Sequence, residues 1–264
     1  MKNDQTGGEM KNADHIVLDI DLAQEIQQLL LPKNSPTCDW CCLGVKNRMA
    51  IGLGGDYFDF LTAPSGCQVI FLGDVTGHGL TASVVMSLIY GYLHHATVRR
   101  CSPLETVAMV NSFLRSFATR SDRFDYLFSS SLFFSVIDPD TLTMRYVNAG
   151  HVAPMVRRGN DLFHLLPTGV PLGFFDDPEM AMCTFQFNKG DRLLLTTDGI
   201  TEASNDRGEF FGNGRLEETL RSFQGDHLEF LDEIYRALAA FGAAEILGDD
   251  CTAIVADFHG PLFR

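Results

Sequence analysis

The chain has 264 residues, of which 45% are hydrophobic and 21 are Phe, enough to bury the core of one large domain or two small ones. Its 34 acidic against 20 basic residues give a net charge of −14, which disfavours nucleic acid and anionic membranes as main partners because both bind positively charged surfaces. The polar start lacks the apolar core of a signal peptide, and no apolar run approaches the roughly 20 residues that span a bilayer. Seven scattered cysteines indicate reduced thiols. A cytoplasmic protein is therefore expected.

The N-terminal part of the chain is predicted to be a disordered stub over residues 1–15, followed by a regulatory or linker helix over residues 16–36. Asp21 is the expected cap, and Gln24 three residues later completes a capping-box pattern. Pro32 ends the helical pattern. An apolar stripe at helical spacing is formed by Leu22, Ile26, Leu29 and Leu30. The stripe fits a helix packed on its own domain as well as a helix that binds a partner or a second copy of the chain.

Residues 37–264 are expected to form one domain in which strands, two helices, strands, two helices and a last strand follow one another. Strands are expected at residues 40–45, 57–61, 69–72, 132–137, 144–148, 154–157, 183–187, 193–197 and 252–258. Helices are expected at residues 79–98, from Ser102-Pro103 onward, at 216–223 and at 228–241. Residues 159–180, rich in Gly, Pro and Asp, are expected to be a flexible excursion. Hairpin-like connections favour largely antiparallel sheets, and helix pairs on the outer faces of two sheets are one layered solution of an α+β fold.

Four aspartates in short glycine-rich or acidic segments stand at the ends of predicted strands. They are Asp56 in Gly54-Gly55-Asp56, Asp74 in Gly73-Asp74-Val75-Thr76-Gly77, Asp198 in Thr197-Asp198-Gly199 and Asp249 in Gly248-Asp249-Asp250. Carboxylates packed together resist ionisation unless a cation holds them. A cluster of oxygen ligands without His or Cys suits Mg²⁺ or Mn²⁺ better than Zn²⁺. The pattern therefore predicts a divalent-metal site at one edge of a sheet.

Such a site can hydrolyse a phosphate ester without a side-chain nucleophile, so no catalytic side chain is assigned. Two divalent ions roughly 3.5–4 Å apart can hold a water molecule and lower its pKa enough to make it a nucleophile. Asp74 is the best candidate for a carboxylate that bridges both ions, since the glycines around it allow close approach of the backbone, and the carbonyl of Val75 could add a ligand. No Ser-His-Asp pattern, nucleophile elbow or phosphate-binding Gly-Lys loop competes with this interpretation.

The motifs together resemble the SpoIIE/RsbU-like serine/threonine phosphatases, a bacterial branch of the metal-dependent protein phosphatase (PPM) superfamily. The matching segments, in chain order, are Ile26-Gln27 through Leu31-Pro32, Gly54-Gly55-Asp56-Tyr57-Phe58-Asp59-Phe60, Gly73-Asp74-Val75-Thr76-Gly77-His78-Gly79, Asn148-Ala149-Gly150-His151, Gly190-Asp191, Thr197-Asp198-Gly199 through Ala203, and Asp249-Asp250-Cys251-Thr252. Each segment alone is a weak signal, but their order over about residues 20–258 is specific.

The resemblance implies a four-layer α-β-β-α sandwich with an N-terminal helix, a PPM-type phosphatase domain over residues 37–264, and two Mn²⁺ or Mg²⁺ ions. Asp56, Asp74 and the Val75 carbonyl would hold one ion, and Asp74, Asp198 and Asp249 the other. It also implies the substrate, phosphoserine or phosphothreonine on a regulatory protein, such as a STAS-type anti-sigma-factor antagonist in a partner-switching pathway of sigma-factor regulation. A homodimer through the N-terminal helix is a further implication.

Three residues near these motifs need a separate interpretation. Asp250 follows Asp249 directly, and successive strand residues face opposite ways, so only one of the two should hold metal; the resemblance favours Asp249. His78 lies four residues after Asp74 and is given no acid role. His151, in a turn-forming context, is favoured as a structural hydrogen-bonding residue over a catalytic one, and no Arg is clearly placed to bind phosphate.

Two other functions compete with the phosphatase. The segment Gly54-Gly55-Asp56-Tyr57-Phe58 is similar to the Gly-Gly-Asp-Glu-Phe signature of diguanylate cyclases, but Tyr57 replaces the acidic residue and the other aspartate motifs have no place in that family. A non-catalytic pseudo-phosphatase that binds a regulator is the second alternative. The presence of all four aspartates argues against it.

Overall fold

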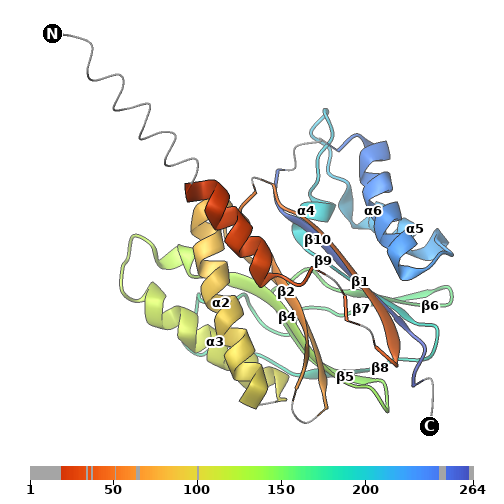
Figure 1. Cartoon of the computed structure of the whole chain (residues 1–264), viewed down its shortest axis with the longest axis horizontal. Coiled ribbons are helices and arrows are strands. Elements are labelled where there is room, and N and C mark those ends of the chain that lie inside the picture. The colour runs from red at the N-terminus through yellow and green to blue at the C-terminus, as the bar shows by residue number, and fades with distance from the viewer. Residues whose placement is uncertain are drawn as a thin grey trace.

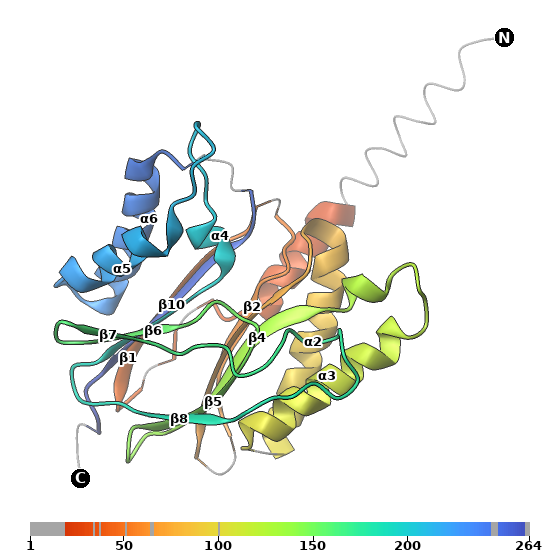
Figure 2. The same cartoon turned by 180° about the vertical axis from the view of Figure 1, so that it is seen from behind.

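The computed structural model describes residues 19–33, 35–36, 38–50, 52–63, 66–99, 101–243 and 248–261. The predicted disordered stub, residues 1–15, lies outside the described residues. Two five-stranded sheets pack face to face, and helix pairs cover their outer faces (Figures 1 and 2). The α+β fold with an α-β-β-α layering and an N-terminal helix, expected from the sequence, is confirmed.

The first sheet has the strand order β1-β10-β9-β6-β7, and the second has the order β2-β3-β4-β5-β8. The strands of the first sheet are β1 (Cys41–Arg48), β10 (Cys251–Phe258), β9 (Arg192–Thr196), β6 (Met155–Arg158) and β7 (Asp161–His164). Those of the second are β2 (Tyr57–Thr62), β3 (Gln68–Val75), β4 (Ser130–Asp138), β5 (Thr143–Ala149) and β8 (Cys183–Gln186). All the ladders between these strands are antiparallel, as the hairpin-like connections predict.

Two pairs of helices cover the sheets. α2 (Gly79–Arg99) and α3 (Pro103–Ala118) lie on the second sheet, while α5 (Gly212–Ser222) and α6 (His227–Phe241) lie on the first (Figures 1 and 2). α6 begins with a complete capping box between Asp226 and Glu229. Ser102 occupies the predicted N-cap of α3, although its hydroxyl forms no capping hydrogen bond. Two short elements complete the chain, α4 (Asp198–Thr201) and the 3₁₀ turn η1 (Asp125–Leu127).

The core lies between the two sheets and continues under the helices. β3 is buried along most of its length, as expected for a strand covered on both faces, and reads as a continuous apolar run. Phe71 of β3 stacks on Phe134 of β4, with ring centroids 6.1 Å apart. Phe187, just after β8, stacks on Phe258 of β10 at 3.7 Å and so joins the two sheets. This packing fixes the strand ends from which the candidate site is built.

Two sequence predictions are wrong in detail. Within the described residues, helix covers residues 19–30, so Asp21 lies inside the N-terminal helix and does not cap it. The excursion over residues 159–180 contains β7, which the sequence analysis missed because this edge strand has only two apolar residues. The excursion is also tied to the second sheet, since Leu172 exchanges two backbone hydrogen bonds with Ser130.

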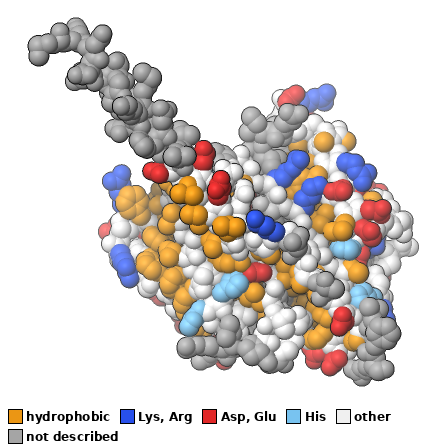
Figure 3. Space-filling model, viewed as in Figure 1, with side chains coloured by type: hydrophobic (Ala, Val, Ile, Leu, Met, Phe, Trp, Pro, Cys, Tyr) orange, Lys and Arg blue, Asp and Glu red, His pale blue; other side chains and the backbone are white. Residues whose placement is uncertain are grey.

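The N-terminal helix presents most of its apolar stripe to solvent. Leu22, Ile26 and Leu29 are 55%, 53% and 69% exposed. On α2, Leu80, Val84 and Leu88 are exposed at four-residue spacing, which places them on one helical face. Figure 3 shows hydrophobic side chains gathered on the side of the molecule where this helix and α2 lie. Among the described residues, no helix is both long enough and apolar enough to cross a membrane.

Candidate metal centre

The four predicted aspartates come from four segments that meet at one end of the two sheets. Asp56 immediately precedes β2 and Asp74 lies near the end of its neighbour β3. Asp198 follows β9, and Asp249 precedes β10, which pairs with β9. Antiparallel pairing brings the start of one strand beside the end of the next, so each pair of segments converges. The structure thus brings the four predicted side chains into one region.

Asp56 is the most deeply buried of the four, at 1% exposure. Its Oδ2 accepts hydrogen bonds from the hydroxyls of Thr197, at 2.9 Å, and Thr252, at 2.5 Å. Behind Thr252, the amide of Asn47 donates to the Thr252 hydroxyl at 2.7 Å. Burial raises the pKa of Asp56 well above its usual range, and the negative charges of Asp74 and Asp250 add to the effect. The hydroxyls hold this carboxylate in place although its charged form is disfavoured.

Asp74 lies in the middle of the carboxylates. Burial raises its pKa to about 8, with further contributions from Asp198, Asp249 and Asp250. The backbone beside it is packed closely: a Cβ on Gly55 would lie 2.8 Å from the Val75 carbonyl oxygen, so only glycine fits there. Glycine at position 55 therefore lets the backbone lie directly beside Val75 and Asp74.

Asp198 and Asp249 complete the group on the side of the first sheet. Asp198 is the first residue of α4, and burial together with the charge of Asp249 raises its pKa. Burial also raises the pKa of Asp249 and the charge of Asp250 adds to this, while the hydrogen bond from the Asp250 backbone N–H and the charge of His78 oppose the shift. The pKa shifts show that each carboxylate senses the negative charge of its neighbours.

Asp250 differs from Asp249 in what its oxygens contact. Its Oδ1 accepts from the backbone N–H of Ala50 at 2.8 Å, and its Oδ2 from that of Gly55 at 2.7 Å. Because Ala50 and Gly55 lie in the loop that precedes Asp56, these two hydrogen bonds hold that loop in place. Asp250 itself is buried, at 2% exposure. Asp249 uses Oδ1 to accept from the N–H of Asp250. The two neighbours thus face different surroundings, although both precede β10 and the difference is therefore not an effect of strand alternation.

The N-terminal helix contacts the same loop through Gln27, which the sequence analysis did not single out. The Gln27 side chain donates to the Gly54 carbonyl at 2.7 Å and accepts from the Gly54 N–H at 3.1 Å. Gln27 is 2% exposed, in contrast to the apolar stripe of the same helix. Its place in the segment Ile26-Gln27, one of those that carry the family resemblance, was the available signal. The loop that carries Asp56 is therefore held by the helix on one side and by Asp250 on the other.

A pocket of about 290 Å³ opens beside the carboxylates. Among the described residues, its lining combines acidic, hydroxyl and apolar groups without Lys or Arg: Asp74, Thr76, Ser131, Gly150, His151, Val152, Pro171, Phe174 and Asp198. His151, 2% exposed, lies with Nδ1 2.8 Å from the Ser131 hydroxyl. Burial lowers the pKa of His151 to about 3, against a smaller opposite effect of the Thr196 backbone. His151 is therefore a neutral member of the pocket wall.

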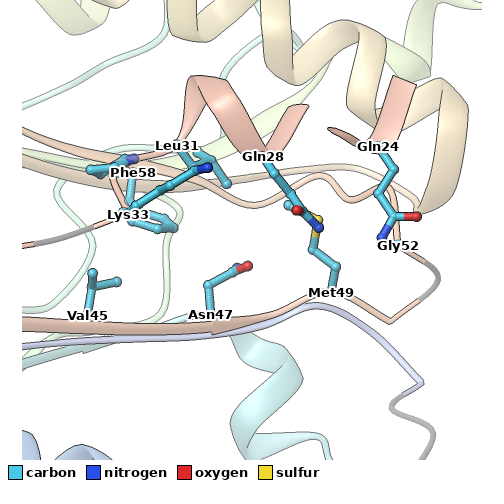
Figure 4. A pocket seen from close by; sticks show the side chains of 10 residues that line it. Gln24, Gln28, Leu31, Lys33, Val45, Asn47, Met49, Gly52 and Phe58 are labelled. Carbon is cyan, nitrogen blue, oxygen red and sulfur yellow. The ribbon is translucent and has the colours of Figure 1, made fainter. Parts of the chain in front are cut away.

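A second pocket, of about 460 Å³, lies between the N-terminal helix and the edge strands β1 and β2 (Figure 4). Gln24 and Gln28 point into it from the helix, and Asn47 and Met49 from the side of β1. Asn47 connects this pocket to the candidate metal centre, because its amide donates to the Thr252 hydroxyl that in turn donates to Asp56.

The donor set of the first site fits a hard divalent cation. Within the described part of the chain, no three His, Cys, Asp or Glu side chains already converge on a point that could hold an ion. The carboxylates nevertheless lie close enough to raise one another's pKa, and a divalent charge between them would offset that repulsion. Carboxylate and carbonyl oxygens are the ligands that Mg²⁺ and Mn²⁺ prefer.

Two curated relatives align with most of this chain. Protein IcfG of Synechocystis sp. is 26% identical over 90% of this chain and 41% of its own length. Phosphoserine phosphatase RsbU of Bacillus subtilis is 24% identical over 90% of this chain and 69% of its own length. The chain thus spans less than half of the first of these relatives.

The solved structures give the fold. The SiaA-PP2C domain of Pseudomonas aeruginosa superposes with a TM-score of 0.79 at 18% identity, covering 94% of this chain and 98% of that domain. The family model described as Stage II sporulation protein E (SpoIIE) matches residues 64–259, which include Asp74, Asp198 and Asp249. The chain belongs to the SpoIIE family and has the fold of a PP2C-type phosphatase domain.

Proposed function

We propose that this chain is a metal-dependent protein serine/threonine phosphatase that hydrolyses phosphoserine or phosphothreonine on a regulatory protein. The observation that carries the proposal is the group of four carboxylates, from four separate segments, that raise one another's pKa beside an open pocket. Family membership supports it, since the relative RsbU is named a phosphoserine phosphatase.

Two Mn²⁺ or Mg²⁺ ions would supply the Lewis acidity and the activated water of the reaction. Asp56, Asp74 and the Val75 carbonyl would hold one ion, and Asp74, Asp198 and Asp249 the other. The central place of Asp74 among the carboxylates supports its bridging role. Asp249 is preferred to Asp250 because both oxygens of Asp250 already accept backbone hydrogen bonds.

The residues around the carboxylates would have two roles, to orient a candidate metal ligand and to contact the substrate. Thr197 and Thr252 fix the orientation of Asp56 through its Oδ2. Phe174, 48% exposed, and Pro171 form an apolar side of the pocket where the peptide next to the phosphoserine would pack. With a net charge of −14, the enzyme repels a phosphorylated acidic partner at long range, so recognition must rest on such short-range contacts.

We further propose that the partner is a small regulatory phosphoprotein, a STAS-type anti-sigma-factor antagonist, and that the exposed stripe of the N-terminal helix either binds it or pairs two phosphatase chains. The exposure of Leu22, Ile26 and Leu29 supports a contact beyond the chain's own core. Cytoplasmic location remains part of this proposal.

The test is hydrolysis of a phosphoserine peptide and of p-nitrophenyl phosphate by the purified chain after treatment with a chelator. We expect activity to disappear and to return with Mn²⁺ or Mg²⁺. Activity that survives chelation, or that returns only with Zn²⁺, would refute the proposal. Binding of the phosphoprotein without turnover would identify a pseudo-phosphatase, and turnover of GTP to a cyclic dinucleotide would identify a cyclase.

A further inference from the structure

Two threonine hydroxyls bind the same oxygen of Asp56. Thr197 and Thr252 both donate to Oδ2, whereas Oδ1 accepts no hydrogen bond from any residue that the structure describes. As a metal ligand, Asp56 is an ionised carboxylate, which accepts hydrogen bonds and donates none. The two hydroxyls therefore occupy one oxygen of Asp56 and leave the other available to an ion.

Each of these hydroxyls accepts a hydrogen bond from a further donor. The Thr197 oxygen accepts from the backbone N–H of Thr252 at 3.0 Å. The Thr252 oxygen accepts from the side-chain amide of Asn47 at 2.7 Å. The donor to Thr197 belongs to the backbone, so Asn47 is the member of this network that a substitution can remove without touching Asp56 or its two direct partners.

The Thr252 hydroxyl has fewer acceptors than the Thr197 hydroxyl. The proton of Thr197 can also reach the Asp250 carbonyl, 3.3 Å from its oxygen. Within the described part of the chain, the proton of Thr252 has Asp56 Oδ2 as its sole acceptor. Asn47 must then face Thr252 with its amide nitrogen, because its oxygen would compete with Asp56 for that proton. The direction of both hydrogen bonds is thereby fixed.

Strand pairing places Asn47 beside Thr252. Asn47 of β1 lies directly opposite Thr252 of β10 in the antiparallel ladder, and opposed residues of a ladder project from the same face of the sheet. Thr252 is fully buried, whereas Asn47 is half-buried and borders the 460 Å³ pocket (Figure 4). Asn47 therefore lies one hydrogen bond further from the candidate metal ligand than Thr252 does.

We propose that Asn47 is a positioning residue for the metal centre: its amide orients the Thr252 hydroxyl, which holds Asp56 by Oδ2 and leaves Oδ1 to the ion. The inference rests on the metal centre of the proposed function and names a residue outside the carboxylate group that sets its Mn²⁺ affinity. Groups that hydrogen-bond a metal ligand orient it before the ion binds, and a chain of such bonds strengthens each member. Asn47 itself contacts neither ion nor substrate, and no proton is transferred.

The first experiment is a calorimetric titration of the metal-free protein with Mn²⁺, which requires no turnover. Asn47→Leu keeps a branched side chain and removes the donor, so it should weaken Mn²⁺ binding by about three- to tenfold, the net effect of one hydrogen bond. Thr252→Val removes the hydroxyl and should weaken binding by about ten- to a hundredfold. The control is Val45→Ala, on the same strand and bordering the same pocket, which should leave Mn²⁺ affinity unchanged.

The second experiment asks whether Asn47 acts through Thr252. In a Thr252→Val background no hydroxyl remains for the amide to orient, so the addition of Asn47→Leu should cause no further loss of Mn²⁺ affinity. In a Thr252→Ser background, which keeps a hydroxyl, Asn47→Leu should again weaken Mn²⁺ binding. A residue that only supports β1 would lower the affinity equally in the wild-type, Val and Ser backgrounds.

The outcomes separate this inference from the proposed function. Wild-type Mn²⁺ affinity in Asn47→Leu, or equal losses in all three backgrounds, would overturn the inference. A wild-type chain that binds Mn²⁺ but hydrolyses no phosphoester would overturn the proposed function and leave the inference standing. Urea unfolding shows whether each variant is folded, and Asn47→Ala takes the place of Asn47→Leu if the larger side chain prevents folding.

Discussion

Gln27 of the N-terminal helix and Gly54 of the loop before β2 exchange two hydrogen bonds, of 2.7 and 3.1 Å, through one side-chain amide. Both polar groups of the Gly54 backbone are satisfied by this one residue. The loop leads directly to Asp56, so the helix is connected to a candidate metal ligand by two residues of backbone.

The first prediction concerns this connection. Gln27→Ala leaves a buried N–H and a buried carbonyl unpaired, so the free energy of unfolding should fall by about 1–3 kcal/mol and Mn²⁺ affinity should fall with it. Chemical unfolding and a Mn²⁺ titration measure both. The matched control is Gln28→Ala, whose side chain is exposed and faces the second pocket. Equal behaviour of the two variants would show that the connection has no energetic effect.

The second prediction is a pH dependence of the metal-free protein. The pKa of Asp74 is raised to about 8, above its unfolded value of about 3.8, so its charge destabilises the folded state. The contribution of Asp74 to the free energy of unfolding should be largest below pH about 4, where the carboxyl is protonated in both states. It should decline as the pH rises toward 8. Asp74→Asn should therefore raise the stability of the metal-free protein at pH 8 by on the order of 1 kcal/mol or more, while most turnover is lost. Thermal unfolding at pH 5 and pH 8 with chelator present measures this, and a wild-type protein whose stability rises over that range would contradict it.

The third prediction separates the two adjacent aspartates. Asp249→Asn should fold like the wild type and lose turnover by at least about a hundredfold, as expected for a metal ligand. Asp250→Asn replaces an acceptor of the Ala50 and Gly55 N–H groups by an amide nitrogen, so it should lower the free energy of unfolding by about 1–3 kcal/mol. Turnover and urea unfolding of both variants decide. A stable, inactive Asp250→Asn beside an active Asp249→Asn would reverse the assignment.

The fourth prediction concerns the apolar side of the pocket. Phe174 lines the pocket, while its neighbour Phe175 is 57% exposed and is absent from the lining. Phe174→Ala should lower kcat/KM for a phosphoprotein about tenfold and leave p-nitrophenyl phosphate nearly unaffected, because only the protein substrate reaches this wall. Phe175→Ala is the control. Equal losses on both substrates would mean that Phe174 only supports the fold.

The fifth prediction concerns the exposed stripe of the N-terminal helix. Ile26→Asp with Leu29→Asp should leave Mn²⁺ affinity intact and impair turnover of the phosphoprotein. Sedimentation distinguishes a dimer contact, which predicts a change of mass, from a direct partner contact, which does not. Leu228→Asp, at an apolar residue of α6 that is 54% exposed, is the control for added charge. A double variant with wild-type rate and mass would make the helix purely structural.

The sequence predicted well those features that depend on local pattern. The strand at Tyr57 begins where expected because the apolar run starts directly after Asp56, and the aspartates stand at strand ends as predicted. That only one of Asp249 and Asp250 holds metal stays a prediction, although the hydrogen bonds of Asp250 show that the two side chains have different contacts.

The features that were missed depend on contacts between distant segments. Gln27 meets Gly54 only after the helix docks, and the hydroxyls of Thr197 and Thr252 meet Asp56 only once both sheets have packed. A single hydroxyl or amide has no characteristic spacing along the chain that would reveal such a partner. β7 was missed because an edge strand, exposed on most of its length, lacks the apolar alternation of an inner strand.

The hydrogen bond between Asp56 and Thr252 joins residues 196 positions apart. Such a contact closes a loop that includes almost the whole domain, so its formation costs more loop-closure entropy than a local contact does. A nascent or truncated chain that ends before Asp249 would have neither this hydroxyl nor that carboxylate, and could not assemble the carboxylate group. Divalent ions that bind only the complete arrangement would then stabilise the finished fold by mass action, and protection from proteolysis by Mn²⁺ would report that synthesis has reached the last strand.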